Sequence, residues 1–194
     1  MAINNPKDWL RQLSVVLDKT KSKVGRAEAS FDVASKEVMA LLKTSITGKR
    51  SVFWVGNGGS ASICAHLSQD MMNKLNIKSL YFGETSLLTC MANDFGYEQV
   101  YAKPLKQFVQ KEDILIAISS SGNSDNILNC VKIAQDTGMK IITLSGMRED
   151  NKLWNSQSDV SFFLSSDLYG IVEVGHEALL HGMIETLWLQ TALS

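Results

Sequence analysis

The loop Ser119–Ser124 (SSSGNS) combines residue types and spacing that could do chemistry. It directly follows an apolar run, Ile114–Ile118, and precedes a helix-like stretch from about Asp125 to Thr137. Hydroxyl groups and free backbone N–H groups would meet there at the positive end of a helix dipole, which suits a phosphate. Since the loop contains no lysine or arginine, neutral donors would hold the anion. The alternative is a serine-rich capping turn with Ser124 as the N-cap.

A second loop, Gly56–Ser60 (GNGGS), lies between a predicted strand and a predicted helix. Its glycines let the backbone approach a ligand closely, and Asn57 and Ser60 can donate hydrogen bonds to oxygens. The spacing is neither the G-x-G-x-x-G of dinucleotide sites nor a P-loop, because no Gly-Lys-Ser/Thr follows. The alternative is a tight strand-to-helix turn without a ligand.

Histidines and carboxylates on two predicted helices form a third group. His66 and Asp70 are spaced i,i+4 and share a helix face. Glu173 and His181 lie two turns apart on the C-terminal helix and differ by about 80°, so they could converge on one ligand. Two histidines and two carboxylates could bind Zn²⁺ or supply bases for proton transfer. The alternatives are a surface His–Asp pair, a structural Glu177–His181 pair and amphipathic helices with solvated charges.

The order of elements along the chain predicts how these groups are positioned. Residues from Pro6 to about Lys49 have the apolar spacing of helices, and after them short apolar strands alternate with helices. The predicted strands are 51–55, 79–82, 114–118, 140–144 and 160–164, and the predicted helices are 61–74, 87–93, one within 97–109, 125–137 and 172–193. Such alternation is typical of a doubly wound parallel α/β sheet, in which ligands bind beyond the carboxyl ends of the strands. Both loops are expected there.

The totals exclude several classes of protein. The chain has 194 residues, which suits one domain, and its net charge of −1 gives no support for nucleic-acid binding. No apolar run approaches the ~20 residues of a membrane helix, and the N-terminus lacks the pattern of a secretory signal. The three cysteines, Cys64, Cys90 and Cys130, are far apart and odd in number, which favours buried thiols in a reducing cytoplasm.

Four motifs occur in this chain in an order and spacing that resemble those of one family. They are Gly56–Ser60, Asn93–Gly96 (NDFG), Ser119–Ser124 and Glu173-x-x-His176-x-x-x-x-His181. Together they resemble the phosphoheptose isomerases, single-domain members of the sugar isomerase (SIS) family. The likeness runs from about residue 50 to 190, and the combination is specific although each motif alone is not.

The resemblance implies a flavodoxin-like sheet with N-terminal helices. Residues 1–49 would form a helical segment that packs on the core or on a neighbouring subunit, and residues 50–194 would form the SIS domain. It also implies a cytoplasmic homotetramer with active sites at subunit interfaces. The implied reaction converts sedoheptulose 7-phosphate to D-glycero-D-manno-heptose 7-phosphate through an enediol, for bacterial lipopolysaccharide or capsule.

Site residues follow from the resemblance position by position. The implied catalytic pair is Asp70 and His181. The implied ligands of one Zn²⁺ are His66, Asp70, Glu173 and His181. The implied substrate contacts are Asn57, Gly58, Ser60, Asp94, Ser119, Ser120, Ser121, Ser124 and Glu173.

The chain departs from the family at four positions near this site. Asp70 stands where the family usually has glutamate, and Glu173 where it usually has glutamine. Lys74 replaces an arginine, and Gly170 replaces an aspartate. These departures keep a second function open, namely a non-catalytic SIS protein that binds a phosphosugar or a replication-initiator protein.

Overall fold

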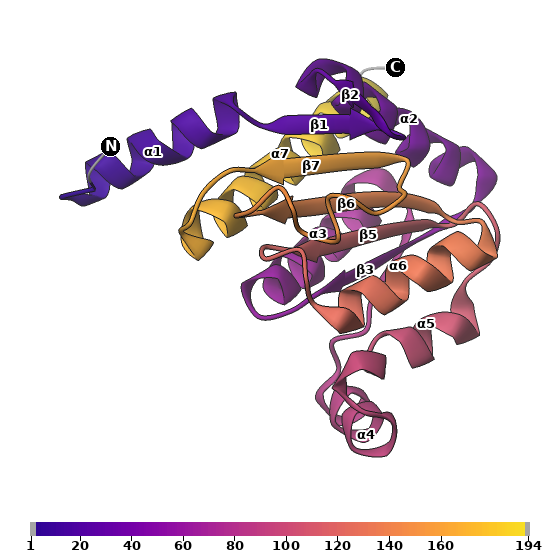
Figure 1. Ribbon diagram of the computed structural model, residues 1–194. Helices are drawn as coiled ribbons and strands as arrows, with labels where there is room; N and C mark the ends of the chain where they lie inside the picture. The colour runs from indigo at the N-terminus through magenta and orange to yellow at the C-terminus, as the bar shows by residue number, and fades with distance from the viewer. Residues whose placement is uncertain (1–2, 193–194) are drawn as a thin grey trace.

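The structure, a computed structural model, describes residues 3–192. A seven-stranded sheet forms its centre, with the strand order β2-β1-β7-β6-β5-β3-β4 (Figure 1). The strands are β1 (Lys21–Val24), β2 (Ala27–Ala29), β3 (Ser51–Gly56), β4 (Lys78–Tyr81), β5 (Ile114–Ser119), β6 (Lys140–Gly146) and β7 (Val160–Leu164). The helices are α1 (Pro6–Asp18), α2 (Phe31–Gly48), α3 (Gly59–Leu75), α4 (Thr85–Phe95), the 3₁₀ turn η1 (Tyr97–Gln99), α5 (Ala102–Phe108), α6 (Asp125–Thr137) and α7 (Tyr169–Ala192).

Five of the strands, β3 to β7, pair in parallel in the order β4-β3-β5-β6-β7. Numbered along the chain, this is the order 2-1-3-4-5 of flavodoxin-like sheets. The prediction of a doubly wound parallel α/β sheet is therefore confirmed. The predicted C-terminal helix reached residue 193, which lies outside the described residues.

Helices cover both faces of the sheet. Side chains from alternate strand positions enter two separate cores, as the pleat requires. One core contains Trp54 and Ile116 and packs against α2, α3 and α7, whereas the other contains Phe53 and Leu115 and packs against α5 and α6. The parallel strands β3, β5, β6 and β7 are buried on both faces, which explains their largely apolar sequences, whereas the edge strand β4 is partly exposed.

The apolar spacing predicted helices from Pro6 to Lys49. This prediction is wrong for the middle of the region, which is not helical. Between α1 and α2 the chain forms a hairpin, β1 and β2, that turns at Gly25 with φ +60°. Strand β1 pairs antiparallel with the edge of β7, with Lys21 opposite Phe163. This pairing satisfies the backbone groups of that edge, an effect of tertiary structure that helical periodicity does not register.

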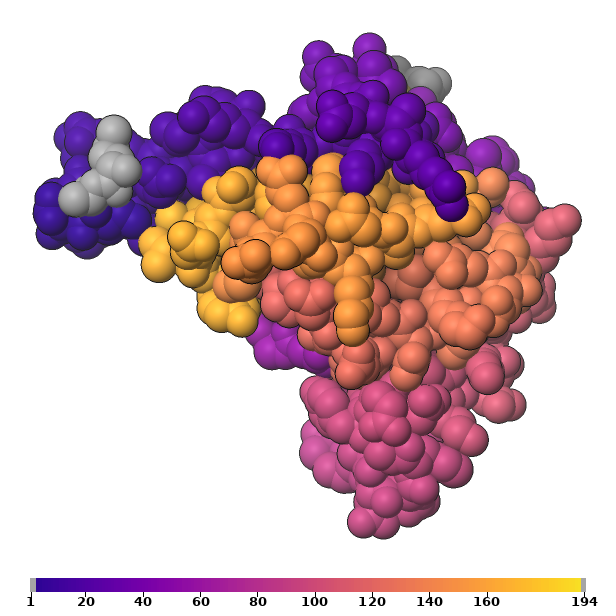
Figure 2. All heavy atoms as spheres, viewed as in Figure 1, coloured from indigo at the N-terminus to yellow at the C-terminus, as the bar shows by residue number. Residues whose placement is uncertain are grey.

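Two segments extend from the body of the molecule. Helix α1, at the indigo end of the chain, projects to one side of the sheet, and α4 projects below it (Figures 1 and 2). Helix α1 contacts α7, and α4 connects to the body through η1. Both extensions leave apolar side chains in contact with solvent, among them Leu10 at 59% exposure and Phe95 at 44%.

Candidate active site

The glycine loop joins β3 to α3 at the carboxyl end of the sheet. A Cβ at Gly56 would lie 2.8 Å from the carbonyl oxygen of Ser60, and Gly58 has φ +54°, so both positions favour glycine. Helix α3 begins at Gly59, and its second residue, Ser60, is buried. The loop therefore presents backbone N–H groups at the positive end of a long helix.

The serine loop joins β5 to α6 at the same end of the sheet. Gly122 has φ +66°, and a Cβ there would lie 1.9 Å from Oδ1 of Asn151. The hydroxyl of Ser119 accepts a hydrogen bond from the N–H of Gly122 at 3.1 Å and donates one to Ser124 Oγ at 3.3 Å. Ser124 occupies the N-cap position of α6, yet its hydroxyl makes no capping hydrogen bond. Its oxygen thus remains directed to the loop, which weighs against a mere capping turn.

Both loops line one cavity of about 280 Å³. Of the predicted substrate contacts, the lining includes Asn57, Gly58, Ser60, Ser119, Ser120, Ser121, Ser124 and Glu173. Tyr169, the first residue of α7, also lines the cavity and has no counterpart in the sequence interpretation. Ser120 lines the cavity, and among residues 3–192 its Oγ is one of the buried side-chain atoms without a hydrogen-bond partner. Neutral donors and the N-termini of α3 and α6 suit an anion.

Glu173 lies in this cavity. A Cβ at Gly59 would be 2.5 Å from the Glu173 carboxyl carbon, so the carboxylate rests against the first residue of α3. A carboxylate is stabilised at the positive end of a helix. Glu173 therefore shares the positive region of the cavity with any anion that binds there.

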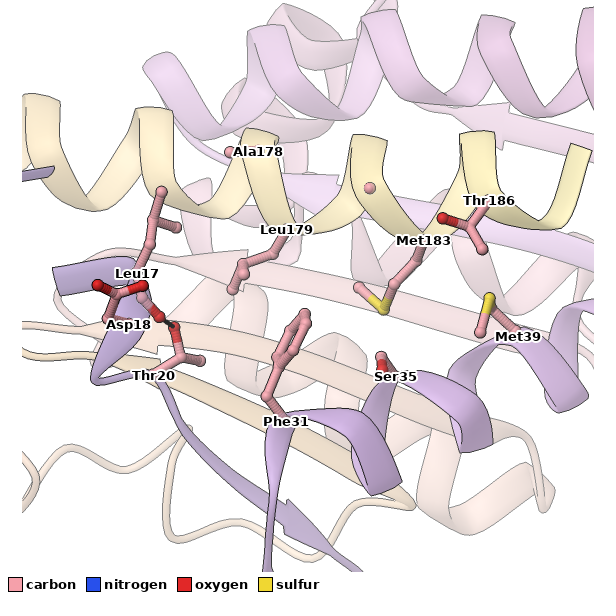
Figure 3. Close-up of a pocket in the computed structure, with 11 residues that line it drawn as sticks. Leu17, Asp18, Thr20, Phe31, Ser35, Met39, Ala178, Leu179, Met183 and Thr186 are labelled. Atoms are coloured by element: carbon pink, nitrogen blue, oxygen red, sulfur yellow. Dashed lines mark hydrogen bonds between the residues drawn. The ribbon is translucent and has the colours of Figure 1, made fainter. Parts of the chain in front are cut away.

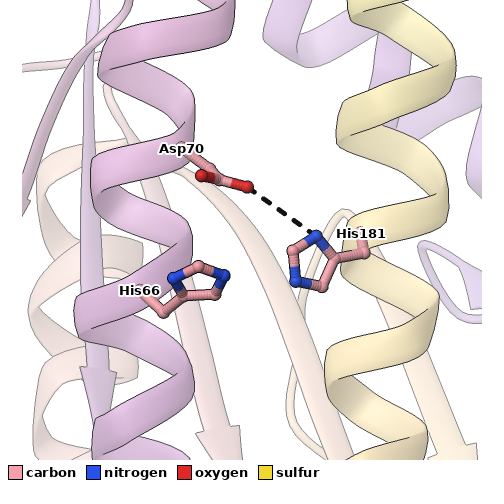
Figure 4. Close-up of side chains that lie close together, drawn as sticks. All are labelled: His66, Asp70 and His181. Carbon is pink, nitrogen blue, oxygen red and sulfur yellow. Dashed lines mark ion pairs between the residues drawn. The ribbon is translucent and has the colours of Figure 1, made fainter.

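The second chemical group lies where α3 packs against α7 (Figure 4). Asp70 Oδ2 lies 3.7 Å from Nδ1 of His181, and the rings of His66 and His181 are 5.2 Å apart between centroids. One ligand atom from each of these three residues lies within 4.8 Å of the others. Asp70 is only 7% exposed, whereas His66 is exposed and His181 is half-buried.

Lys74 and Glu185 extend this cluster by a chain of charges. Lys74 Nζ donates to Asp70 Oδ2 at 2.9 Å and to Glu185 Oε1 at 2.8 Å. Hydrogen bonds to Glu185 and then Asp70 raise the pKa of Lys74, and the hydrogen bond from Lys74 lowers the pKa of Glu185. Lysine thus remains charged beside Asp70 and fixes one oxygen of that carboxylate.

The donor set of this cluster fits a zinc ion. Two imidazoles and a carboxylate are ligands that zinc prefers, and ligands at ~2.0–2.2 Å from one ion lie within the separation observed. Glu173, the fourth predicted ligand, does not belong to this group of three and lines the cavity between the two loops instead. The structure therefore brings together His66, Asp70 and His181.

Asp94 lies apart from both groups. It sits near the end of α4 and is exposed, with Cys90 Sγ at 3.5 Å and the Asn93 amide at 2.9 Å from its carboxylate. It is not among the cavity-lining residues of the described chain. The single chain therefore does not place Asp94 at this cavity, and its contact with the sugar stays a prediction.

His176 serves the fold. It is completely buried, and its Nε2 lies 3.0 Å from the carbonyl oxygen of Ser145. Burial lowers the pKa of His176 to about 4, with the hydrogen bond to Ser145 opposing the shift. The neutral ring therefore donates from Nε2 and ties α7 to the end of β6. The rival pair Glu177–His181 is present at 3.9 Å.

Comparisons with known proteins support one family. The SIS domain family matches residues 17–146. A curated phosphoheptose isomerase from Helicobacter pylori (strain P12) is 34% identical over 167 residues, which are 83% of this chain and 86% of the relative. Another, from Histophilus somni (strain 2336), is 34% identical over 116 residues, or 57% of this chain and 60% of the relative.

Solved structures match in fold over nearly the whole chain. A phosphoheptose isomerase from Neisseria gonorrhoeae has a TM-score of 0.80 and 23% identity, covering 93% of this chain and 95% of that one. One from Francisella tularensis has a TM-score of 0.82 and 22% identity, covering 96% and 98%.

Proposed function

Because the chain belongs to the SIS-domain family and, within it, to the phosphoheptose isomerases, we propose that it isomerises sedoheptulose 7-phosphate to D-glycero-D-manno-heptose 7-phosphate. The product would supply heptose for lipopolysaccharide or capsule. The observation that carries this proposal is that α7 contributes one residue to the anion cavity and another to the His–Asp cluster. Glu173 in the cavity and His181 in the cluster are eight residues apart, or ~12 Å along α7.

The length of the substrate fits this separation. Seven carbons and a phosphate, with bonds of about 1.5 Å, have a similar extended length. The serine loop would hold the phosphate, and carbons 1 and 2 would lie toward Asp70 and His181. The loop has no lysine or arginine, so its neutral N–H and O–H groups would donate charge-assisted hydrogen bonds to the phosphate.

Asp70 and His181 would transfer the proton. One of them accepts a proton from carbon 1 of the ketose, which gives a cis-enediolate. A proton moves from the hydroxyl on carbon 1 to the oxygen on carbon 2 through the enediol, and the other group returns a proton to carbon 2, which gives the aldose. Their 3.7 Å separation lets both reach adjacent carbons of one sugar. Lys74 would keep the Asp70 carboxylate in a single orientation during this exchange.

We propose that His66, Asp70 and His181 hold one Zn²⁺. Bound zinc would polarise an oxygen of the sugar next to the carbon that loses its proton. After dialysis against zinc, metal analysis should find about one ion per chain. His66→Ala should lose most of it, whereas Glu177→Gln should retain it; equal zinc content in both variants would exclude this ligand set.

A homotetramer with sites at subunit interfaces is proposed on the basis of one groove. The groove has a volume of about 590 Å³ and lies between α7, the start of α2 and the end of α1 (Figure 3). Leu17, Phe31, Leu179 and Met183 give it an apolar lining. A neighbouring subunit could cover this groove, and assembly could bring Asp94 of one subunit to the anion cavity of another. In this proposal residues 1–49 serve assembly and residues 50–194 carry the site.

We also propose a cytoplasmic location. The cysteines of the described chain are free, which fits a reducing compartment. Cys64 and Cys130 are buried as predicted, whereas the prediction of a buried thiol is wrong for Cys90, which is exposed. Among residues 3–192, no helix is long and apolar enough to cross a membrane. A non-catalytic role is not favoured, because the curated relatives are named isomerases and the His–Asp cluster is complete.

The direct test is turnover. The purified protein is incubated with sedoheptulose 7-phosphate, with and without Zn²⁺, and formation of the aldose is followed by NMR. Appearance of the aldose heptose 7-phosphate supports the proposal. No turnover under either condition, together with capture of an initiator protein by the purified chain, would favour the non-catalytic role instead.

A further inference from the structure

The side chain of Asn57 is engaged within the protein. Its Nδ2 donates to Oδ1 of Asn126 at 2.9 Å, and Nδ2 of Asn126 donates back to Oδ1 of Asn57 at 2.8 Å. The hydroxyl of Tyr97 also approaches Asn57 Oδ1, at 3.3 Å. Because an amide oxygen has two acceptor sites, the oxygen of Asn57 is fully used. Asn57 can offer at most one N–H to a ligand.

This amide pair joins the two loops of the anion cavity. Asn57 belongs to the glycine loop after β3, and Asn126 is the second residue of α6, directly after the serine loop. Asn126 is buried, and its Oδ1 also accepts from the N–H of Ile127 at 3.1 Å. The partners are 69 residues apart in sequence, so the pair fixes one loop against the other.

The segment that begins with η1 supports the pair formed by Asn57 and Asn126. Tyr101, which follows η1, donates its buried hydroxyl to the carbonyl oxygen of Gly56 at 2.7 Å. Asn129 of α6 donates to the carbonyl oxygen of Glu98 at 2.9 Å. Tyr97 thus stands on a segment that is itself anchored to the glycine loop and to α6.

We propose that Asn126 is a positioning residue that sets the separation of the glycine and serine loops through its paired amide with Asn57, with Tyr97 as a secondary support. The inference deepens the proposed function and rests on it. Neutral N–H and O–H donors bind an anion well only when they are held in place before it arrives. Loss of the pair should therefore weaken binding of the phosphosugar and leave proton transfer at Asp70 and His181 largely unchanged.

The test compares Asn126→Ala, Asn57→Ala and the double variant with the wild type in steady-state kinetics. Asn57→Ala removes the partner of the buried Asn126 amide, and Asn126→Ala removes the partner of the half-buried Asn57 amide. In both variants KM should rise about 10- to 100-fold while kcat stays within about threefold. The double variant should be no worse than the single ones, because both remove the same interaction. Tyr97→Phe, which keeps the amide pair, should raise KM only about two- to fivefold.

Asn129→Ala is the matched control. It removes an asparagine one turn further along α6 that bonds to η1 and not to the glycine loop. Because it loosens only the secondary support and keeps the amide pair, its KM should rise no more than that of Tyr97→Phe. Thermal unfolding of every variant shows that it is folded, and Asn57→Ala, at a less buried position, keeps the test open if Asn126→Ala does not fold. An unchanged KM in Asn57→Ala, a fall in kcat alone, or a double variant whose KM increase equals the product of the single increases would overturn the proposal.

Binding of inorganic phosphate separates this inference from the proposed function. If the wild type binds phosphate but does not isomerise the sugar, the proposed reaction fails, and a weaker phosphate affinity in Asn126→Ala still supports the positioning role. If the wild type and Asn126→Ala bind phosphate equally, the positioning role fails whatever the turnover. If the wild type binds neither phosphate nor the sugar, the anion cavity itself is wrong and both proposals fall.

Discussion

Asp70 and His181 lie on different helices, and each has a second charged neighbour. Lys74 contacts Asp70, and Glu177 lies 3.9 Å from His181. The hydrogen bond from Lys74 keeps Asp70 in one orientation, which general acid–base catalysis requires, whereas the contact between Glu177 and His181 is too long for a hydrogen bond. The proposed phosphate donors, in contrast, are neutral and come from loop hydroxyls. Residue changes should therefore separate turnover from binding.

Replacing His181 should abolish turnover and spare binding. His181→Ala removes a group that accepts or returns the proton, and we expect a loss of about 10²- to 10⁴-fold in kcat. NMR of the aldose product measures kcat, and calorimetry with the sugar phosphate measures affinity. Glu177→Gln, one turn away, is the control and should stay near the wild-type rate. Near-normal activity of His181→Ala would remove it from the reaction.

The serine loop should act on affinity instead. Ser119→Ala combined with Ser124→Ala removes two donors to a charged acceptor, worth ~1.5–3 kcal/mol each. The dissociation constant of the sugar phosphate should rise accordingly, with Ser86→Ala, an exposed serine on α4, as the control. Unchanged affinity in the double variant would mean that the phosphate binds elsewhere.

At the scale of elements, His176 makes the junction between α7 and β6 sensitive to pH. In the unfolded chain a histidine takes up a proton below about pH 6.5, whereas burial lowers the pKa of His176 to about 4 in the folded protein. The unfolded state therefore binds more protons between these values, so stability is full above about 6.5 and falls as the pH drops toward 4. The expected loss is roughly 3 kcal/mol from this group.

Urea unfolding at several pH values tests this dependence. In His176→Gln the side-chain amide can still donate to Ser145 but does not titrate. Its free energy of unfolding should vary less between pH 6.5 and 4 than that of the wild type. An identical slope for both proteins would show that His176 is not the group responsible.

The turn between β5 and α6 depends on Gly122. An alanine there would adopt φ +66° and place its Cβ 1.9 Å from Asn151 Oδ1. We expect Gly122→Ala to lower the free energy of unfolding by about 1–3 kcal/mol or more. Gly48→Ala, at the end of α2, should instead be neutral or stabilising by up to ~1 kcal/mol. Thermal unfolding of the two variants gives the comparison, and equal melting temperatures would contradict it.

The sequence was sufficient to predict elements whose signal is local. Continuous apolar runs identified all five parallel strands, and the two loops stood out by glycine and serine content. The hairpin at Lys21–Ala29 was missed because its short, polar strands depend on pairing with β7. Asn126 and Tyr97 were missed for the same reason, since their contacts with Asn57 span 69 and 40 residues.

At the scale of the whole molecule, the exposed apolar side of α1 should control assembly. Leu10 is exposed on a helix that extends from the body, and the neighbouring groove is apolar (Figures 1 and 3). Leu10→Glu should shift light-scattering mass from a tetramer toward smaller species, because burying an unpaired carboxylate is costly. Lys7→Glu on the same helix is the charge control. A wild-type protein of single-chain mass would contradict the tetramer.

Helix α7 is the common support of three features: Glu173 in the anion cavity, His181 in the metal-type cluster and Leu179 in the apolar groove. One added residue in an α-helix rotates everything beyond it by about 100° and advances it by about 1.5 Å. A single alanine inserted between Glu173 and His181 would therefore turn the histidine away from Asp70 while the cavity stayed intact. Helix α7 should therefore tolerate many single substitutions, but almost no insertion or deletion between Glu173 and His181.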